Sequence, residues 1–208
     1  MRRPGKIVCV GRNYRDHAKE LGNEVPKDPL IFLKPPSSLV GEGDAIVLPP
    51  ASRQVEYEGE IGILIGKRLR HATADEAAAA IHGVVAVNDV TARDLQKSDG
   101  QWTRAKGFDT FCPVGQVAGS VSDLSNLTVR TRVNGEERQH GRSGDLVFDI
   151  PFLLSYISRV MTLEPGDLVA TGTPAGVGTL SPGDVVEVEI SGGAGVLSSV
   201  RNPVTAER

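Results

Sequence analysis

The segment 55–65 alternates between apolar and polar side chains, and this pattern limits the structure it can adopt. One face carries Val55, Tyr57, Ile61, Ile63 and Ile65, and the other carries Glu56, Glu58, Glu60 and Gly62. A period of two is typical of a β-strand, in which successive side chains point to opposite faces of the sheet. The pattern therefore predicts a strand with a buried apolar face and an acidic face.

Further short apolar runs, bounded by turn residues, predict more strands. The strand candidates are 6–10, 30–34, 83–88, 127–133, 136–139 and 185–190. Asn134-Gly135 joins two of them and is a preferred sequence for a type I′ hairpin turn. Two Pro-Gly-Asp sequences, at 165–167 and 182–184, fit type II turns that lead into apolar strands. The 24 glycines and 13 prolines agree with a chain rich in tight turns and β-structure.

Helical signals are fewer. A helix over 13–22 is predicted with Asn13 as its N-cap and Gly22 just past its end. The capping box Thr73-Ala-Asp-Glu76 predicts a helix that ends near Ile81. Two further helices are predicted over 91–94 and 149–160, the second from an apolar stripe of Phe152, Leu153, Tyr156, Ile157 and Val160. Because strands and helices do not alternate regularly, we expect a β-dominated α+β fold in one domain rather than a doubly wound fold.

Charge and composition exclude several functional classes. The net charge of −3 and the lack of long basic runs argue against a nucleic-acid partner. Apolar stretches near the N-terminus, such as 7–10, are too short for a membrane span or a signal peptide, so no membrane partner is expected. Cys9 and Cys112 lie far apart without His or Cys at ligand spacing, which argues against a disulfide and against a zinc site. We therefore expect a cytoplasmic protein with both thiols reduced.

Three carboxylates are candidate metal ligands. Glu58 and Glu60 point to the same side of the predicted strand, with Cα atoms roughly 6–7 Å apart. Asp89 ends the apolar run 84–88, where a carboxylate is costly to bury unless it is paired or bound to a cation. Carboxylates without His or Cys favour Mg²⁺ or Mn²⁺ over Zn²⁺. The alternatives are a solvent-facing charged row for the glutamates and, for Asp89, a helix N-cap or an ion pair with Arg93.

His17 and Glu20 lie three residues apart on the helix predicted over 13–22 and are neighbours on its surface. A carboxylate in that position can orient an imidazole and raise its basicity, which would make His17 a general base. An exposed pair with no catalytic role fits the same spacing. The residues alone leave both interpretations open.

Six stretches, taken in order along nearly the whole chain, resemble the fumarylacetoacetate hydrolase family in its short form, which includes acylpyruvate hydrolases and oxaloacetate decarboxylases. The stretches are Val10-Gly-Arg-Asn-Tyr14 continuing to His17 and Glu20, Ile31-Phe-Leu-Lys-Pro35, Tyr57-Glu-Gly-Glu-Ile61, Asn88-Asp-Val-Thr-Ala-Arg-Asp94, Gln101-Trp-Thr-Arg-Ala-Lys106, and Gly166-Asp167 through Thr171-Gly-Thr-Pro-Ala-Gly-Val-Gly178. Each stretch alone is weak, but six in order are specific.

The resemblance implies a role for each candidate residue. It implies one Mg²⁺ or Mn²⁺ per chain held by Glu58, Glu60 and Asp89, water activation by His17 with Glu20, a lysine facing the metal-bound substrate at Lys106, and substrate contacts from Arg93, Gln96 and Thr173. The fold implied is a mixed β-sandwich roll with a few short helices, usually a homodimer. Because the first motif begins almost at the N-terminus, we expect one catalytic domain over 1–208 without the extra N-terminal domain of longer members.

The reaction implied is C–C bond hydrolysis of an acylpyruvate or a related 2,4-dioxo acid through a metal-bound enolate. Water activated by His17 would attack the C4 carbonyl, and Lys106 would stabilise the pyruvate enolate that leaves. Decarboxylation of oxaloacetate and isomerisation of the 2-hydroxyhepta-2,4-diene-1,7-dioate type, or another keto–enol tautomerisation, use the same site and remain alternatives. A non-catalytic metal- or ligand-binding protein is a further alternative. A small 2-oxo acid is the expected partner in every catalytic case.

Overall fold

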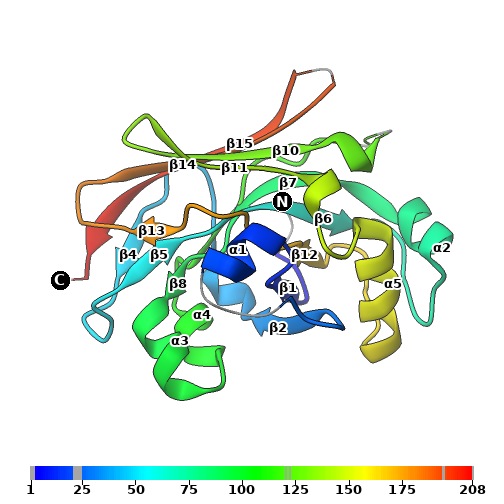
Figure 1. Ribbon diagram of the computed structural model, residues 1–208, viewed down its shortest axis with the longest axis horizontal. Helices are drawn as coiled ribbons and strands as arrows, with labels where there is room; N and C mark the ends of the chain where they lie inside the picture. Colours follow the sequence, from blue (N-terminus) through cyan, green and yellow to red (C-terminus); the bar gives the residue numbers. More distant parts are fainter. Residues whose placement is uncertain (1–2, 21–24, 120, 122, 194, 208) are drawn as a thin grey trace.

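The computed structural model describes residues 3–20, 25–119, 121, 123–193 and 195–207, without the side chains of residues 17–19. Strands are the main regular structure of the described chain, and two five-stranded sheets are its largest parts. The two sheets lie one above the other, and short helices cover the edges (Figure 1). The predicted β-dominated fold with a few short helices is therefore confirmed.

The first sheet contains the strands that carry the candidate site. Its order is β2 (Leu30–Lys34), β1 (Ile7–Gly11), β12 (Leu168–Ala170), β6 (Gly59–Ile65) and β7 (Ile81–Asn88). Strands β1 and β12 are parallel, and the remaining neighbours are antiparallel. Both faces of this sheet are covered, since alternate residues of β1 belong to two different apolar clusters. Strands buried on both faces read as continuous apolar runs, as 7–10 and 84–87 do.

The second sheet lies over one face of the first. Its order is β11 (Glu136–Arg142), β10 (Thr128–Val133), β14 (Val185–Gly192), β15 (Gly195–Ala206) and β4 (Ile46–Leu48). Inward residues of β14, Val188 and Ile190, share one core with Ile61 and Ile63 of β6. Burial alternates along β10 and β14, as the period of two requires for a sheet with one covered face. The two sheets thus form a sandwich around a common apolar core.

Two small sheets and the helices complete the fold. The small sheets pair β13 (Gly178–Thr179), β5 (Val55–Tyr57) and β8 (Thr91–Ala92), and β3 (Leu39–Val40) with β9 (Cys112–Pro113). The helices are α1 (Arg15–Glu20), α2 (Ala74–Ala79), α3 (Arg93–Asp99), α4 (Thr103–Gly107) and α5 (Ile150–Val160), with 3₁₀ turns at Pro36–Ser38, Leu124–Asn126 and Ser143–Asp145. Helices α2 and α5 lie together at one end, and α3 and α4 lie together near β8 (Figure 1).

Local turn and capping signals are confirmed. Asn134 and Gly135 have φ angles of 54° and 84°, as a type I′ hairpin turn requires. The capping box of Thr73 and Glu76 is present at the start of α2, although the chain has already entered β7 at Ile81. Residues 91–92, expected to be helical, instead form β8.

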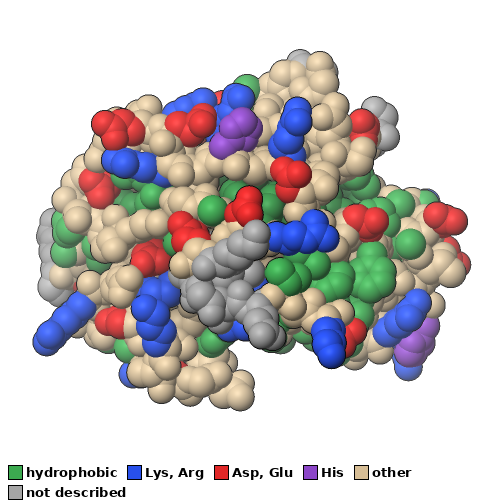
Figure 2. All heavy atoms as spheres, in the orientation of Figure 1, with side chains coloured by type: hydrophobic (Ala, Val, Ile, Leu, Met, Phe, Trp, Pro, Cys, Tyr) green, Lys and Arg blue, Asp and Glu red, His purple; other side chains and the backbone are tan. Residues whose placement is uncertain are grey.

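The helices predicted over 13–22 and 149–160 are present as α1 and α5, but one detail of each is wrong because distant segments decide it. Asn13 does not cap α1; its buried side chain bonds the backbone of Phe148 and Thr171, and Gly22 lies outside the described residues. On α5, Phe152 and Val160 are exposed, while Ile150, Leu153, Leu154 and Ile157 form the buried stripe. Figure 2 shows apolar side chains gathered over α5, where Phe152 stacks between Phe148 and Tyr156.

The cysteines and the helix lengths can both be compared with the sequence-based predictions. Cys9 and Cys112 are both buried free thiols, as expected. Burial raises the pKa of Cys112 to about 12, so this thiol stays protonated and unreactive at neutral pH. Within the described residues, none of the helices has the length and apolar character needed to cross a membrane.

Candidate active site

The segment predicted as one strand over 55–65 is two strands, and the break between them helps to form the site. Strand β5 ends at Tyr57 and β6 begins at Gly59, which leaves Glu58 between them. The Glu58 N–H donates to Asn88 Oδ1 at 2.9 Å, and its carbonyl accepts from the Asp89 N–H at 2.8 Å. These bonds bring the end of β7 beside the break and place Asp89 next to Glu58.

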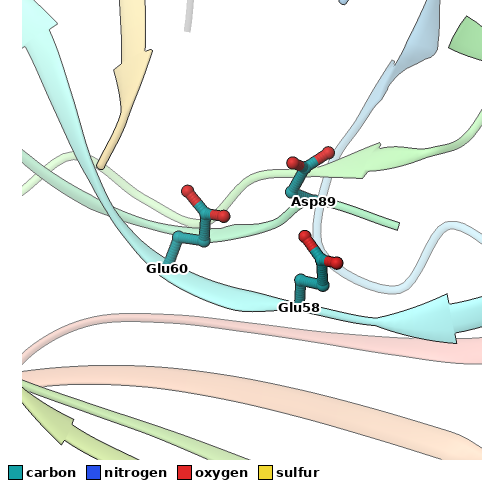
Figure 3. Close-up of side chains that lie close together, drawn as sticks. All are labelled: Glu58, Glu60 and Asp89. Atoms are coloured by element: carbon teal, nitrogen blue, oxygen red, sulfur yellow. The ribbon is translucent and has the colours of Figure 1, made fainter. Parts of the chain in front are cut away.

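Glu58, Glu60 and Asp89 form a buried acidic cluster. Each offers one carboxylate oxygen, and these three oxygens lie within 4.8 Å of one another. Figure 3 shows the two glutamates extending from neighbouring positions of the chain and Asp89 approaching from the adjacent segment. All three residues are at most 5% exposed, which excludes the solvent-facing charged row. The glutamates predicted to share one face do lie close together, but they are in the protein interior and not at its surface.

A glycine is required between the two glutamates. A Cβ atom at Gly59 would lie 2.0 Å from Oγ1 of Thr131, a residue of β10 in the covering sheet. A side chain at this position would force the side chain of Thr131, or the strand that carries it, to shift. The glycine therefore allows the second sheet to approach the backbone that carries both glutamates.

Two buried lysines neutralise part of the negative charge. Lys106 Nζ lies 2.7 Å from both Glu58 Oε2 and Asp89 Oδ2. Lys34 Nζ lies 2.6 Å from Asp89 Oδ1 and also donates to the Val90 carbonyl at 3.0 Å. Asp89 is therefore paired with these lysines and not with Arg93. Buried charges at such distances stay ionised only when each has an opposite charge nearby.

The pKa values of Glu60 and Lys106 are both raised, but for different reasons. Burial raises the pKa of Glu60 well above its ordinary value, and repulsion from Asp89 and Glu58 raises it further. Lys106 and a 2.7 Å hydrogen bond from the Gly172 N–H act in the opposite direction without cancelling this effect. Burial alone would lower the pKa of Lys106, but Asp89 and Glu58 outweigh it and raise the pKa. The cluster therefore favours an added cation, while Lys106 stays charged.

The acidic cluster fits a divalent metal ion of the hard type. Three carboxylates provide oxygen ligands, and no His or Cys belongs to the cluster as far as the described residues show. A cation bound there would offset the repulsion that raises the pKa of Glu60. Three protein ligands also leave coordination positions for substrate and water. Glu58, Glu60 and Asp89 are thus able to hold Mg²⁺ or Mn²⁺.

The three predicted substrate contacts, Arg93, Gln96 and Thr173, line a small pocket beside the acidic cluster. Arg93 donates to Glu56 through Nε at 2.8 Å and forms a second ion pair with Glu58 through Nη2. Its Nη1 donates to Gln96 Oε1 at 2.5 Å, which holds both side chains in the pocket wall. Thr173 Oγ1 donates to the Gly59 carbonyl at 2.9 Å. The pocket wall is therefore tied directly to the backbone of the acidic cluster.

Helix α1 carries the predicted water-activating pair. Glu20 Oε1 accepts from the Gly176 N–H at 3.0 Å, which ties the end of α1 to the glycine-rich loop 171–178. The side chain of His17 lies outside the described part of the chain, although its backbone belongs to α1. The role of His17 therefore stays a prediction.

Sequence analysis missed two buried residues of the site, Lys34 and Gln139. Lys34 follows four apolar residues of β2 and precedes Pro35, so its pattern resembles a strand end that reaches solvent. Gln139 follows Glu136, Glu137 and Arg138, and a run of polar residues has no periodicity that marks an inward side chain. The only signal for Lys34 was its place within one of the stretches that resemble the family.

Gln139 connects the acidic cluster to the glycine-rich loop. Its Oε1 accepts from the Gly59 N–H at 2.9 Å, while its Nε2 donates to Thr173 Oγ1 at 2.8 Å and to the Pro174 carbonyl at 2.9 Å. The side chain is 1% exposed, so water does not replace these partners. One residue of β11 therefore positions both the backbone between two candidate metal ligands and a predicted substrate contact.

Replacing Gln139 by Leu should destabilise the protein by about 2–4 kcal/mol, because buried groups left without a partner each cost about 1–3 kcal/mol. Mn²⁺ affinity should also fall, since Gly59 lies between Glu58 and Glu60. Urea unfolding and Mn²⁺ titration measure the two effects. Thr131→Val is the matched control: within the described structure the Thr131 hydroxyl is buried without a hydrogen-bond partner, so its loss should cost less than about 1 kcal/mol. A Gln139→Leu variant as stable as the parent would contradict this role.

Comparison with known proteins identifies the family. Residues 6–205 match the fumarylacetoacetate (FAA) hydrolase C-terminal family, so the chain belongs to it. An uncharacterized protein of Methanocaldococcus jannaschii is 52% identical over 176 residues, which cover 85% of this chain and 74% of that protein. Human oxaloacetate tautomerase FAHD2A, a mitochondrial protein, is 46% identical over 181 residues, which cover 85% of this chain and 58% of its own length.

Solved structures show the same fold. A 5-carboxymethyl-2-hydroxymuconate delta-isomerase from Mycobacterium smegmatis superposes with a TM-score of 0.90 at 43% identity, covering 99% of this chain and 80% of that one. A 2-hydroxyhepta-2,4-diene-1,7-dioate isomerase from Mycobacterium marinum gives a TM-score of 0.87 at 47% identity, covering 99% and 76%. These two proteins and the human relative are described as isomerases or a tautomerase. The family resemblance found in the sequence is therefore confirmed, and its known members include isomerases and a tautomerase.

Proposed function

We propose that this chain is a Mg²⁺- or Mn²⁺-dependent enzyme that forms the enolate of a small 2-oxo acid and catalyses keto–enol tautomerisation. The observation that carries the proposal is the buried cluster of Glu58, Glu60 and Asp89 in the wall of a pocket that also contains Lys106. Tautomerisation is placed ahead of hydrolysis because three of the similar proteins are described as isomerases or a tautomerase.

Each group in the pocket would contribute to the reaction in a different way. When bound by the three carboxylates, the divalent cation supplies Lewis-acid polarisation of the 2-oxo group. Lys106 keeps its positive charge because Asp89 and Glu58 raise its pKa, and it would stabilise negative charge that develops on the substrate oxygen. Arg93 and Gln96 line the pocket and are hydrogen-bonded to each other. Thr173 also lines it and is hydrogen-bonded to the Gly59 carbonyl. The low exposure of these groups strengthens their electrostatic effect.

Hydrolysis of an acylpyruvate is the second candidate. The observation that favours it is the 3.0 Å hydrogen bond between Glu20 and Gly176, which fixes α1 against the loop that contains Thr173. His17 on the same helix would then remove a proton from water, and the water would add to the C4 carbonyl. The C3–C4 bond would break with its electron pair moving to the enolate of pyruvate, which takes up a proton. Decarboxylation of oxaloacetate would use the same enolate without water attack.

A product assay over a panel of 2-oxo acids with Mg²⁺ or Mn²⁺ separates these reactions. A change in the ultraviolet absorbance of the enol without cleavage products supports tautomerisation. Pyruvate plus a second acid indicates hydrolysis, and CO₂ indicates decarboxylation. No metal-dependent change with any member of the panel would overturn the proposal and favour a binding protein.

A further inference from the structure

Three cationic residues among those that the structure describes line the pocket beside the acidic cluster, and two of them are already paired. Arg93 bonds Glu56 and Glu58, and Lys106 bonds Glu58 and Asp89. The third is Arg12, which is partly buried. Across the described residues, Arg12 makes no ion pair or hydrogen bond through its guanidinium. Among the described residues of this pocket, Arg12 is therefore the cation that remains available for a ligand.

The backbone of Arg12 is held in a conformation that an arginine rarely adopts. Its φ angle is 58°, in the left-handed region, immediately after β1 ends at Gly11. The next residue, Asn13, fixes this turn: its side chain donates to the Thr171 carbonyl at 2.8 Å and accepts from the Phe148 N–H at 2.9 Å. Non-glycine residues held at positive φ cost stability and are concentrated at ligand sites.

The charge balance around the pocket also requires a further cation for one class of substrate. Within the described residues, the buried charged groups linked to the cluster are four carboxylates and three cations, namely Glu56, Glu58, Glu60 and Asp89 with Lys34, Arg93 and Lys106. When all are charged the sum is one negative charge, and a divalent ion changes it to one positive charge. That charge matches a monoanionic 2-oxo acid. A dicarboxylic 2-oxo acid needs one more positive charge to be neutralised in a buried site.

We propose that Arg12 binds the distal carboxylate of a dicarboxylic 2-oxo acid and thereby sets a preference for dianionic over monoanionic substrates. This inference rests on the function proposed above, since it assigns the other end of the same substrate. A guanidinium presents paired N–H donors in a fixed plane that matches a carboxylate, so the contact selects geometry as well as charge. The strained turn after β1 would be retained because it holds this guanidinium in the pocket wall.

The first test compares oxaloacetate, a dianion, with 2,4-dioxopentanoate, a monoanion, as substrates. Arg12→Gln should lower kcat/KM for oxaloacetate by roughly 10–100-fold, as expected for loss of a charged hydrogen-bonded pair. The same variant should change kcat/KM for 2,4-dioxopentanoate by less than about threefold. Arg12→Lys should recover part of the lost oxaloacetate activity, because it keeps the charge without the bidentate geometry. An equal loss with both substrates, or no loss with either, would overturn the proposal.

Two further variants separate substrate binding from stability and from general charge. Arg12→Gly removes the guanidinium but tolerates φ of 58°, so it should unfold at no lower urea concentration than the parent while losing the same preference. Arg15→Gln removes the same charge from an exposed arginine of α1. If the effect were electrostatic attraction of anions to the pocket entrance, Arg15→Gln would reproduce the effect of Arg12→Gln, and the proposal would be wrong.

A binding measurement makes the proposal testable even if the protein does not tautomerise these acids. Malate and lactate both chelate a metal through a carboxylate and a 2-hydroxyl group, and only malate carries a distal carboxylate. Calorimetric titration of the Mn²⁺-loaded protein should show tighter binding of malate, and Arg12→Gln should remove the difference while leaving lactate affinity unchanged. A parent protein that binds both equally would overturn the role of Arg12. A malate preference without turnover would sustain it and would refute only the proposed reaction.

Discussion

Glu60→Gln should lower Mn²⁺ affinity by at least ~100-fold and abolish metal-dependent activity, because losing a charged ligand exceeds the 10–100-fold cost typical of changing a residue that only orients a ligand. The carboxylate is 1% exposed and belongs to the cluster whose oxygens lie within 4.8 Å of one another. The amide keeps the shape and can still accept the hydrogen bond from the Gly172 N–H, so the fold should persist. Calorimetric titration with Mn²⁺ measures the affinity, and circular dichroism checks the fold.

Glu56→Gln is the matched control for this variant. Glu56 is also a buried glutamate, but its carboxylate bonds Arg93 and Gln54 and does not belong to the acidic cluster. The control should change Mn²⁺ affinity by less than ~10-fold, since it alters a neighbour of a ligand rather than a ligand. Equal losses in the two variants would mean that general negative charge, and not ligation by Glu60, holds the ion.

His17→Ala should remove acylpyruvate hydrolysis, if the parent has this activity, while leaving Mn²⁺ affinity intact. A general base contributes typically about 10²–10⁴-fold, so the loss in kcat/KM should be large. Decarboxylation needs no attacking water, so it should fall less than hydrolysis. Glu20→Gln should act in the same direction with a smaller effect if Glu20, as predicted, orients His17 and does not itself remove the proton.

The comparison of substrates decides the role of His17. The measurement is kcat/KM for an acylpyruvate and for oxaloacetate in both variants, with metal content determined for each. If His17→Ala hydrolyses acylpyruvates at nearly the parent rate, water activation belongs to another group. Lys106→Ala provides the contrast, since it should damage every reaction that passes through the enolate.

The sequence predicts those features that local residues determine. The I′ turn at Asn134-Gly135 and the capping box at Thr73 depend on a few adjacent residues, and both are present. The acidic cluster could also be predicted, because the period of two places Glu58 and Glu60 on one side and Asp89 ends a buried run. Each of these signals is contained within one short segment.

The remaining features depend on segments that are distant in the sequence. The acidic face is buried because Lys34 of β2, Arg93 of α3 and Lys106 of α4 pack against it, and nothing within 55–65 indicates this. Asn13 fails as an N-cap because Thr171 and Phe148 offer backbone partners to its side chain. Gln139 is in a polar run without periodicity, so only the packed structure reveals that it connects Gly59 to Thr173.

The central claim is that divalent metal at Glu58, Glu60 and Asp89 promotes enolate formation, and hydrogen exchange at C3 of pyruvate tests it most directly. Pyruvate dissolved in D₂O exchanges its methyl hydrogens only through the enol or enolate, and proton NMR follows the loss of signal. We expect exchange faster than in buffer with Mg²⁺ alone, stopped by a chelator, restored by added Mg²⁺, and absent in Glu60→Gln. Exchange no faster than in buffer, or equally fast with the chelator and in Glu60→Gln, would contradict the claim.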